Sequence, residues 1–274
     1  MRSIANQDRV MIHICIPCRN EDRTIGVLLW KIREVMVDLG RDFQVFVLDD
    51  ASSDGTGKLL EKYKRILPLT VLSERRPIGY GPAVEKLLRA AAGWTKYPKR
   101  DAIVTMQGDF TEHPEHLRAL IKTFEGGADV VVGGPGTEAA QQGAEARGRT
   151  GSGQSPPRAV RLARWLARIM LDKGVGGPGG GDPLLGFRVY RAIVIRKALR
   201  AAAARPLIST DGWAANAELM KVLSPFARQV AEVPLELRYD IRRRSTRVRV
   251  FGTVRQILRV RKVLPLEPEG HGAA

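Results

Sequence analysis

The chain has 274 residues, 44% of them hydrophobic, and carries a formal net charge of +16 at pH 7. This length and apolar content fit one α/β domain with a sizeable core, and they argue against a fibrous protein. No stretch reaches the roughly 18 uncharged apolar residues that a membrane span requires, and the polar N-terminus lacks the apolar segment of a signal peptide. We therefore expect a cytoplasmic chain, either free or peripheral at the inner face of the membrane.

Apolar strands and amphipathic helices alternate through the first half of the chain. Five apolar runs predict strands, at residues 10–16, 43–48, 69–72, 102–106 and 129–133. Four amphipathic segments predict helices between them, at residues 24–39, 56–66, 82–93 and 114–124. Strands separated by helices pair in parallel through right-handed crossovers. The pattern predicts an α/β fold, with a mostly parallel Rossmann-like sheet between helices.

Glycine-rich segments interrupt the second half. Residues 134–158 are dominated by Gly, Gln, Ser and Pro, which predicts a mobile or disordered loop. The glycine tract at 174–181 lacks the Gly-Lys-Ser/Thr ending of a phosphate-binding P-loop, so a flexible lid is favoured. The remaining predictions are helices at 159–172 and 211–223, a strand at 229–238, and flexible ends at 1–9 and 265–274. The single domain is expected to span residues 10–237.

A basic amphipathic segment, residues 238–264, follows the predicted domain. Between Arg238 and Lys262 it carries ten Arg or Lys residues and one acid, Asp240. Such a charge attracts anionic membranes, nucleic acid or phosphorylated substrates, although a solvated helix face is the simpler explanation. Its helix, at about 248–264, is expected to pack on the core and present a basic rim to the membrane. Only Tyr239 and Phe251 could stack on bases, so no nucleic-acid partner is expected.

Carboxylates follow two of the predicted strands. Asp49 and Asp50 end one apolar run, and Asp109 comes shortly after another. In an open α/β sheet, ligands bind in the crevice outside the carboxyl ends of the strands. Acids there can contact a nucleoside or hold a divalent cation beside a diphosphate, although helix capping also explains Asp54 and Asp109. We expect a nucleotide site at this edge, with Asp50 on the nucleoside and Asp49 shaping the turn.

Several motifs, in order along the chain, resemble those of the family 2 glycosyltransferases with the GT-A fold. They are I-P-C-R-N-E at 16–21, V-L-D-D-A-S-S-D-G-T at 47–56, G-Y-G-P-A at 79–83 and Q-G-D at 107–109. Two later elements are similar to the dolichol-phosphate mannose synthase-like branch: D-P-L-L-G-F-R at 182–188, and E-V-P at 232–234 followed by an Arg-rich segment with Ser245. The resemblance runs from about residue 10 to 262.

The resemblance implies roles around a nucleotide-sugar donor. The residues implied to line the base and ribose are Pro17, Arg19, Glu21, Leu48 and Asp50. Asp54 is implied to shape the same pocket, and helix capping explains it equally well. The segment Gln107, Gly108 and Asp109 takes the place of the family's Asp-x-Asp motif, so Asp109 is implied to hold Mg²⁺ or Mn²⁺ with Gln107 as a weaker, neutral ligand.

The resemblance also implies an acceptor site. Asp182 is implied to serve as general base or to orient the acceptor, and Arg188, Arg244 and Arg247 to bind the diphosphate or the acceptor phosphate. The implied reaction is inverting transfer from a nucleotide diphosphate sugar to a polyprenyl phosphate or similar lipid-linked acceptor. The alternatives are a glycosyltransferase with a soluble acceptor, or a non-catalytic protein that binds nucleotide sugars or other anions.

Three positions depart from the family's pattern. Gln107 replaces an acid, Pro135 stands where relatives carry Arg, and Thr246 stands where they carry Lys. These departures indicate an altered donor or acceptor.

Overall fold

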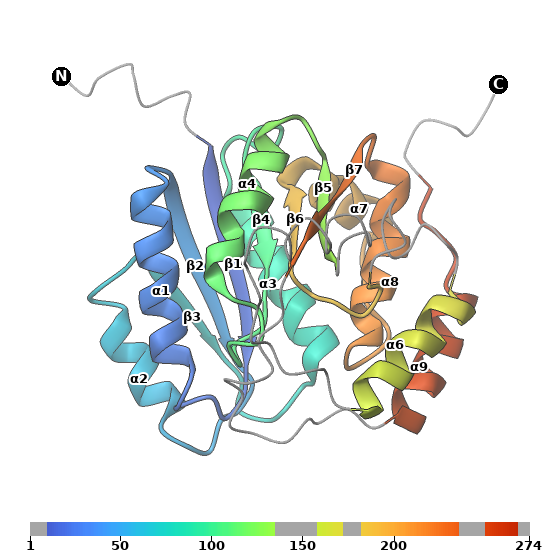
Figure 1. The fold of residues 1–274 in the computed structure, drawn as a ribbon, viewed down its shortest axis with the longest axis horizontal. Coiled ribbons are helices and arrows are strands. Elements are labelled where there is room, and N and C mark those ends of the chain that lie inside the picture. Colours follow the sequence, from blue (N-terminus) through green and yellow to red (C-terminus); the bar gives the residue numbers. More distant parts are fainter. Residues whose placement is uncertain (1–9, 135–157, 172–181, 236–249, 268–274) are drawn as a thin grey trace, which may run out of the picture.

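A computed structural model describes residues 10–134, 158–171, 182–235 and 250–267. Within them, one sheet lies between two layers of helices (Figure 1). The strands are β1 (Met11–Cys18), β2 (Asp42–Asp49), β3 (Leu69–Ser73), β4 (Ala102–Thr105), β5 (Val130–Gly134), β6 (Arg188–Arg191) and β7 (Val230–Pro234). The α-helices are α1 (Ile25–Asp38), α2 (Thr56–Tyr63), α3 (Tyr80–Trp94), α4 (Leu117–Glu125), α6 (Arg158–Met170), α7 (Ala192–Ala202), α8 (Ala214–Leu223) and α9 (Val250–Lys262). Short 3₁₀ helices are η2 (Pro114–His116) and η4 (Ser224–Phe226).

The strands are arranged in the order β3-β2-β1-β4-β6-β5-β7. All neighbours pair in parallel except β6, which is antiparallel to both β4 and β5. The predicted mostly parallel α/β sheet is therefore confirmed. The predictions did not include β6, because a four-residue strand with an arginine at each end gives almost no alternating pattern. They also missed α7, although its buried residues recur at helical spacing.

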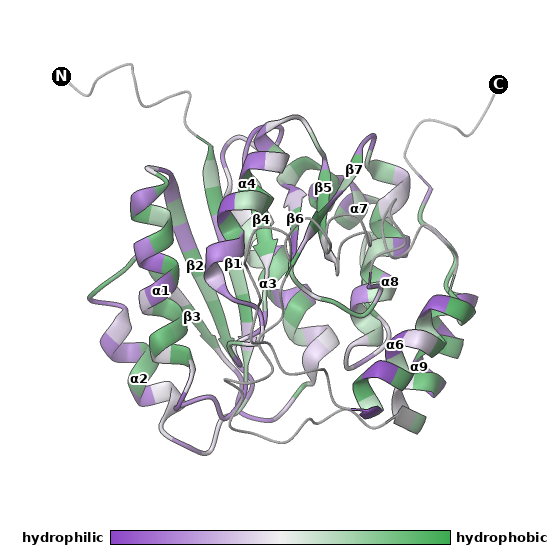
Figure 2. Ribbon diagram, viewed as in Figure 1, coloured by the Kyte–Doolittle hydropathy of each residue, from purple (hydrophilic) through white to green (hydrophobic). Residues whose placement is uncertain are grey.

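The sheet buries both of its faces, which is why its central strands are continuous apolar runs. Successive residues of a strand point to opposite faces, so Ile14 lies in one core cluster and Cys15 in the other. The first cluster contains buried side chains of α1 and α4, and the second contains those of α3, α7 and α8. Figure 2 shows the resulting hydrophobic strands between helices with mixed faces.

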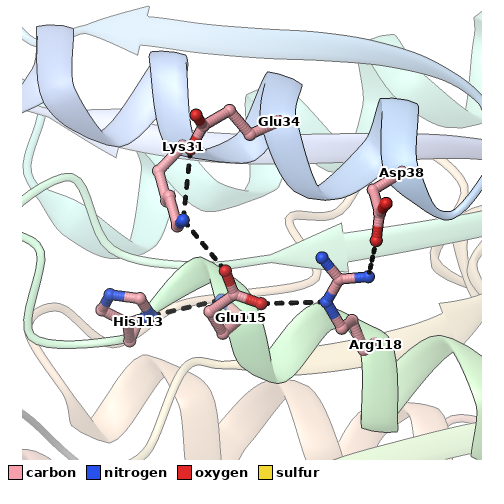
Figure 3. Close-up of polar contacts among 6 residues, drawn as sticks. All are labelled: Lys31, Glu34, Asp38, His113, Glu115 and Arg118. Atoms are coloured by element: carbon pink, nitrogen blue, oxygen red, sulfur yellow. Dashed lines mark hydrogen bonds and ion pairs between the residues drawn. The ribbon is translucent and has the colours of Figure 1, made fainter.

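The segment after β4 is fastened to α1 by the network of ion pairs in Figure 3. Lys31 Nζ lies 3.0 Å from a carboxylate oxygen of Glu115, in η2. Arg118 reaches both Glu115, at 2.9 Å, and Asp38, at 2.5 Å, while the Glu115 amide donates to Nδ1 of His113 at 3.3 Å. Exposed ion pairs contribute little stability individually. Their effect here is to fix η2 and the start of α4 against α1.

Helices α6 and α9 pack against each other at one end of the molecule (Figure 1). The helix predicted at 248–264 is confirmed as α9, and it packs on the core as expected, through Ile257 and Val260. Phe251 and Leu258, on the same helix, stay exposed instead. Among the described helices, none is both long and apolar enough to cross a membrane.

Some predicted segments lie outside the described residues. They are the interior of the loop at 134–158, the glycine tract at 174–181, the N-terminal residues 1–9, most of the C-terminal tail, and the segment that holds Arg244 and Arg247.

Candidate active site

A cavity of about 440 Å³ opens at the carboxyl ends of β1, β2 and β4, the edge at which open α/β sheets bind ligands. Its volume is in the range of small-molecule sites. Seven residues that the motifs singled out line it: Pro17, Arg19, Glu21, Asp50, Gln107, Gly108 and Asp109. The sheet topology brings these residues together from three separate strand ends. The rest of the wall comes from the start of α3, from the loop before α8 and from α9.

Backbone strain marks the same edge of the sheet. Asn20, Ala51 and Phe110 follow β1, β2 and β4 and have positive φ angles of 54°, 53° and 63°. A residue with a Cβ is rarely found in this left-handed region, at a cost of about 1–3 kcal/mol, and such residues cluster at functional sites. A fourth such residue in the described parts of the chain, Ala203, ends α7. Three of the four thus lie at this edge, which points to it independently of the motifs.

Asp50 connects the end of β2 to the start of α3. Its buried carboxylate accepts hydrogen bonds from the amide of Ile78 at 2.6 Å and from the amide of Gly79 at 3.2 Å. Each carboxylate oxygen retains a lone pair after accepting one hydrogen bond. Asp50 can therefore hold this loop and still face a ligand in the cavity.

Two glycines at the start of α3 allow a second acid, Asp211, to approach. The Gly81 amide donates to Asp211 at 3.1 Å. Gly79 has φ +93°, and a Cβ there would lie 2.8 Å from the Asp211 carboxylate. Asp211 lines the cavity, and the motifs did not identify it. The only sequence signal for it is an acid in the polar turn that precedes α8.

Substituting Gly81 by alanine should lower stability, because the new Cβ would lie 2.2 Å from the carbonyl oxygen of Thr210. We expect Gly81→Ala to reduce the free energy of unfolding by about 1–3 kcal/mol in urea titrations. Gly93→Ala is the control on the same helix, since a Cβ there meets nothing within 4 Å. The control should gain about 0.5–1 kcal/mol from helix propensity. Equal effects of the two substitutions would contradict this packing.

Asp109 and Gln107 lie in a tight loop after β4. Asp109 is buried and accepts from the Thr111 amide at 3.1 Å. The described parts of the chain contain no group of three or more His, Cys, Asp or Glu side chains that could hold a metal ion by itself. A hard cation bound through one or two protein oxygens and the phosphates of a substrate suits this donor set. The Asp109 carboxylate and the Gln107 amide oxygen therefore fit Mg²⁺ or Mn²⁺ held together with a diphosphate.

Glu112 is hydrogen-bonded to the backbone of this loop. One carboxylate oxygen accepts from the Gln107 amide at 2.7 Å, and the other has no hydrogen-bond partner among the described residues. Burial, and to a smaller extent the neighbouring Asp109, raise the pKa of Glu112 to about 8, although the Gln107 hydrogen bond and the nearby arginines oppose the shift. Glu112 is therefore mostly neutral at pH 7 and adds little negative charge beside Asp109. No motif identified it.

The raised pKa of Glu112 predicts a pH dependence of stability. The folded state binds this proton more tightly than the unfolded state, so stability should fall as pH rises from 4.5 to about 8 and then level off. Glu112→Gln should remove this component. The free energy of unfolding, measured in urea at several pH values, should show a slope difference between the two proteins confined to that window. An identical slope would show that Glu112 is ionised in the folded state at neutral pH.

Asp182 is placed by the structure in an ion pair. It is buried, accepts from the Leu184 amide at 3.0 Å, and lies 2.5 Å from Nε of Arg164, on α6. It is not among the described residues that line the cavity. The structure thus gives Asp182 a buried ion-pair partner and a backbone hydrogen bond at this position.

Three residues that were predicted for the site contact the protein itself and do not line the cavity. Arg188 is buried and donates to the carbonyl oxygens of Asn216 at 2.5 Å and Pro183 at 3.0 Å, so the prediction that it binds phosphate is wrong. Leu48 is enclosed in the core, because the alternation of β2 points it into the helix layer. Asp54 accepts from the Thr56 amide at 2.9 Å and from the Asp22 amide at 3.2 Å, so its carboxylate fixes the turn just before α2, whose N-cap residue is Gly55. None of the three belongs to the described lining of the cavity.

The mostly parallel sheet with helices on both faces is a fold of the GT-A glycosyltransferase type. Residues 13–175, more than half of the chain, match the family model for glycosyl transferase family 2. The chain therefore belongs to glycosyltransferase family 2, as its motifs indicated.

The chain is also similar to curated proteins. Over 122 residues the chain is 28% identical to an undecaprenyl-phosphate 4-deoxy-4-formamido-L-arabinose transferase from Pseudomonas fluorescens (strain Pf0-1), covering 44% of this chain and 34% of that protein. It is also 28% identical to the transferase of the same name from Proteus mirabilis (strain HI4320), covering 44% of this chain and 35% of that protein. The chain thus spans about a third of the length of these relatives.

Solved structures share the fold. Glucosyl-3-phosphoglycerate synthase from Mycobacterium tuberculosis, in complex with Mn²⁺, UDP and glucosyl-3-phosphoglycerate, aligns with a TM-score of 0.62 and 20% identity, covering 92% of this chain and 78% of that one. S. aureus TarS in complex with UDP aligns with a TM-score of 0.51 and 14% identity, covering 83% of this chain and 59% of that one. At these identities the likeness shows the fold.

Proposed function

We propose that the chain is an inverting, metal-dependent glycosyltransferase that moves a sugar from a nucleotide diphosphate sugar to a polyprenyl phosphate or a similar lipid-linked acceptor. The observation that carries the proposal is the cavity at the carboxyl edge of the sheet, in which Glu21, Asp50 and Asp109 gather beside Arg19. Family membership supports the reaction class, and the curated relatives named for undecaprenyl phosphate support the lipid acceptor.

The donor would lie along the strand ends. Pro17, Arg19, Glu21 and Asp50 would contact the nucleoside, and Asp109 with Gln107 would hold Mg²⁺ or Mn²⁺. When bound, the ion would neutralise charge on the leaving diphosphate. The Mn²⁺ and UDP of the mycobacterial synthase are consistent with this assignment.

The acceptor would be activated mainly by its position. A phosphate acceptor is already anionic, so alignment opposite the leaving group contributes more than deprotonation does. Asp182, paired with Arg164, would then help to shape the acceptor side rather than remove a proton. Arg244 and Arg247 remain our proposed phosphate ligands, and the basic segment at 238–264 our proposed contact with an anionic membrane at its inner face.

A transfer assay tests the proposal. The protein is incubated with radiolabelled nucleotide sugars of several bases, Mg²⁺ or Mn²⁺, and polyprenyl phosphate, and the products are partitioned between butanol and water. We expect label in the organic phase only when the lipid, the ion and one matching donor are present. Label confined to an aqueous product made from added soluble acceptors would establish the soluble alternative. Donor binding without any turnover would indicate a non-catalytic protein.

A further inference from the structure

The outer side of α6 carries large apolar side chains. Trp165 is 58% exposed and Ile169 is 62% exposed, and Leu162 is exposed beside them. Their spacing of three and four residues places them on one face of the helix. The opposite face, represented by Ala163 and Ala167, is buried in the core. The exposed apolar face is therefore continuous, and it is distinct from the face that packs.

Helix α9 has a similar outer face. Phe251 is 93% exposed, and Leu258 is exposed two turns further along. Arg255 and Lys262 follow these two residues at an interval of four, so basic and apolar side chains alternate on one side of the helix. The inner face of α9 packs into the same core cluster as that of α6. Because both inner faces meet in one cluster, both outer faces point away from the protein.

The outer faces of α6 and α9 are strongly basic. Neither α6 nor α9 contains an acidic residue. Their exposed cations are Arg158, Arg161, Arg168, Arg255, Arg259, Arg261 and Lys262. Aromatic and aliphatic side chains rimmed by Lys and Arg are the pattern of helices that lie in the headgroup region of anionic bilayers. The long basic side chains can extend to the lipid phosphates while the apolar groups enter the bilayer.

Helix α9 also forms part of the cavity wall, through Gly252, Thr253 and Gln256. The same helix thus faces the core, the cavity and solvent. Phe251, which points outward, is the chain neighbour of Gly252 in the wall. A bilayer in contact with the outer face would therefore lie beside the cavity.

We propose that the outer faces of α6 and α9 form a docking surface for an anionic lipid bilayer, which brings the cavity to the membrane. The surface consists of Leu162, Trp165, Ile169, Phe251 and Leu258 with the exposed cations above. The proposed transfer to a lipid acceptor gives such a surface its biological purpose, and in that respect alone the docking surface rests on the proposed function. The lipid contact itself stands on exposure, spacing and charge.

Vesicle flotation tests the surface directly. The full chain is mixed with vesicles of phosphatidylcholine and phosphatidylglycerol, or of phosphatidylcholine alone. We expect wild-type protein to float with the anionic vesicles, and Trp165→Ser/Phe251→Ser to bind them at least tenfold more weakly. The matched control is Trp30→Ser/Val27→Ser, which removes two exposed apolar side chains from α1 and should bind like wild type. Arg255→Gln/Arg259→Gln should weaken binding to the anionic vesicles and reduce its dependence on salt.

Two results would overturn the inference. One is unchanged flotation of Trp165→Ser/Phe251→Ser, and the other is binding of wild type to DNA or an acidic peptide but not to anionic vesicles. Nucleotide-induced shifts of the melting temperature, measured on the same samples, separate this inference from the proposed function. Loss of flotation with retained nucleotide shifts supports the surface. Flotation without donor turnover would contradict the proposed function and leave the surface established.

Discussion

Asp109→Ala is expected to lower kcat/KM for sugar transfer by about two to three orders of magnitude, because it removes the carboxylate assigned to the cation beside the leaving diphosphate. The residual activity should no longer respond to Mn²⁺ concentration. Initial rates measured across a Mn²⁺ titration check both effects.

Asp54→Asn is the matched control for this experiment. The motifs assigned Asp54 to the same pocket, but the structure places it at the start of α2, outside the described lining of the cavity. We expect this variant to keep its KM for the donor and to change stability little, because the Asn side-chain oxygen can still accept the Thr56 amide. If Asp54→Asn impaired transfer as strongly as Asp109→Ala, the cavity would extend beyond the residues that line it here.

Asp50→Ala is expected to damage both folding and donor binding. It leaves the Ile78 and Gly79 amides without their acceptor, which should cost about 1–3 kcal/mol of stability. It also removes a cavity carboxylate, so nucleotide affinity should fall at temperatures where the variant is still folded. Urea unfolding and calorimetric titration with nucleotide measure the two effects separately.

A substitution of the neighbouring acid, Asp49, distinguishes the effect on stability from the effect on nucleotide affinity. Asp49 accepts from the Ser52 amide at 3.0 Å and shapes the turn, and it is not among the described lining residues. Asp49→Ala should therefore lose stability while the folded protein retains nucleotide affinity. Equal loss of affinity in both variants would mean that Asp50 acts only through the loop it holds.

Predictions at strand ends succeeded for a geometric reason. Parallel strands share one carboxyl edge, so Asp50 and Asp109 were expected to converge, and both line the cavity. Asp49 ends the same strand but turns to the Ser52 amide, and Glu21, which the family resemblance implied, also lines the cavity. Arg188 failed because a motif gives residue type and order but not the direction of a side chain. The guanidinium of Arg188 is used to satisfy buried carbonyl groups.

The missed residues come from contacts that local patterns do not encode. Asp211 reaches the cavity because two glycines at the start of α3 let its loop approach. Glu112 matters through burial, which depends on the helices packed around it. Gln256 lines the cavity from a helix that is distant in sequence from the motifs. Each of these contacts depends on tertiary packing, so neither periodicity nor motif order could predict it.

The assignment of this cavity to a nucleotide and a cation is tested most directly by anomalous diffraction. A crystal would be soaked with Mn²⁺ and with whichever of UDP, GDP or dTDP raises the melting temperature most. We predict a manganese peak within ligand distance of the Asp109 carboxylate, a diphosphate beside it, and the nucleoside against Pro17 and Asp50. A nucleotide bound outside this cavity, or manganese bound away from Asp109, would contradict the account.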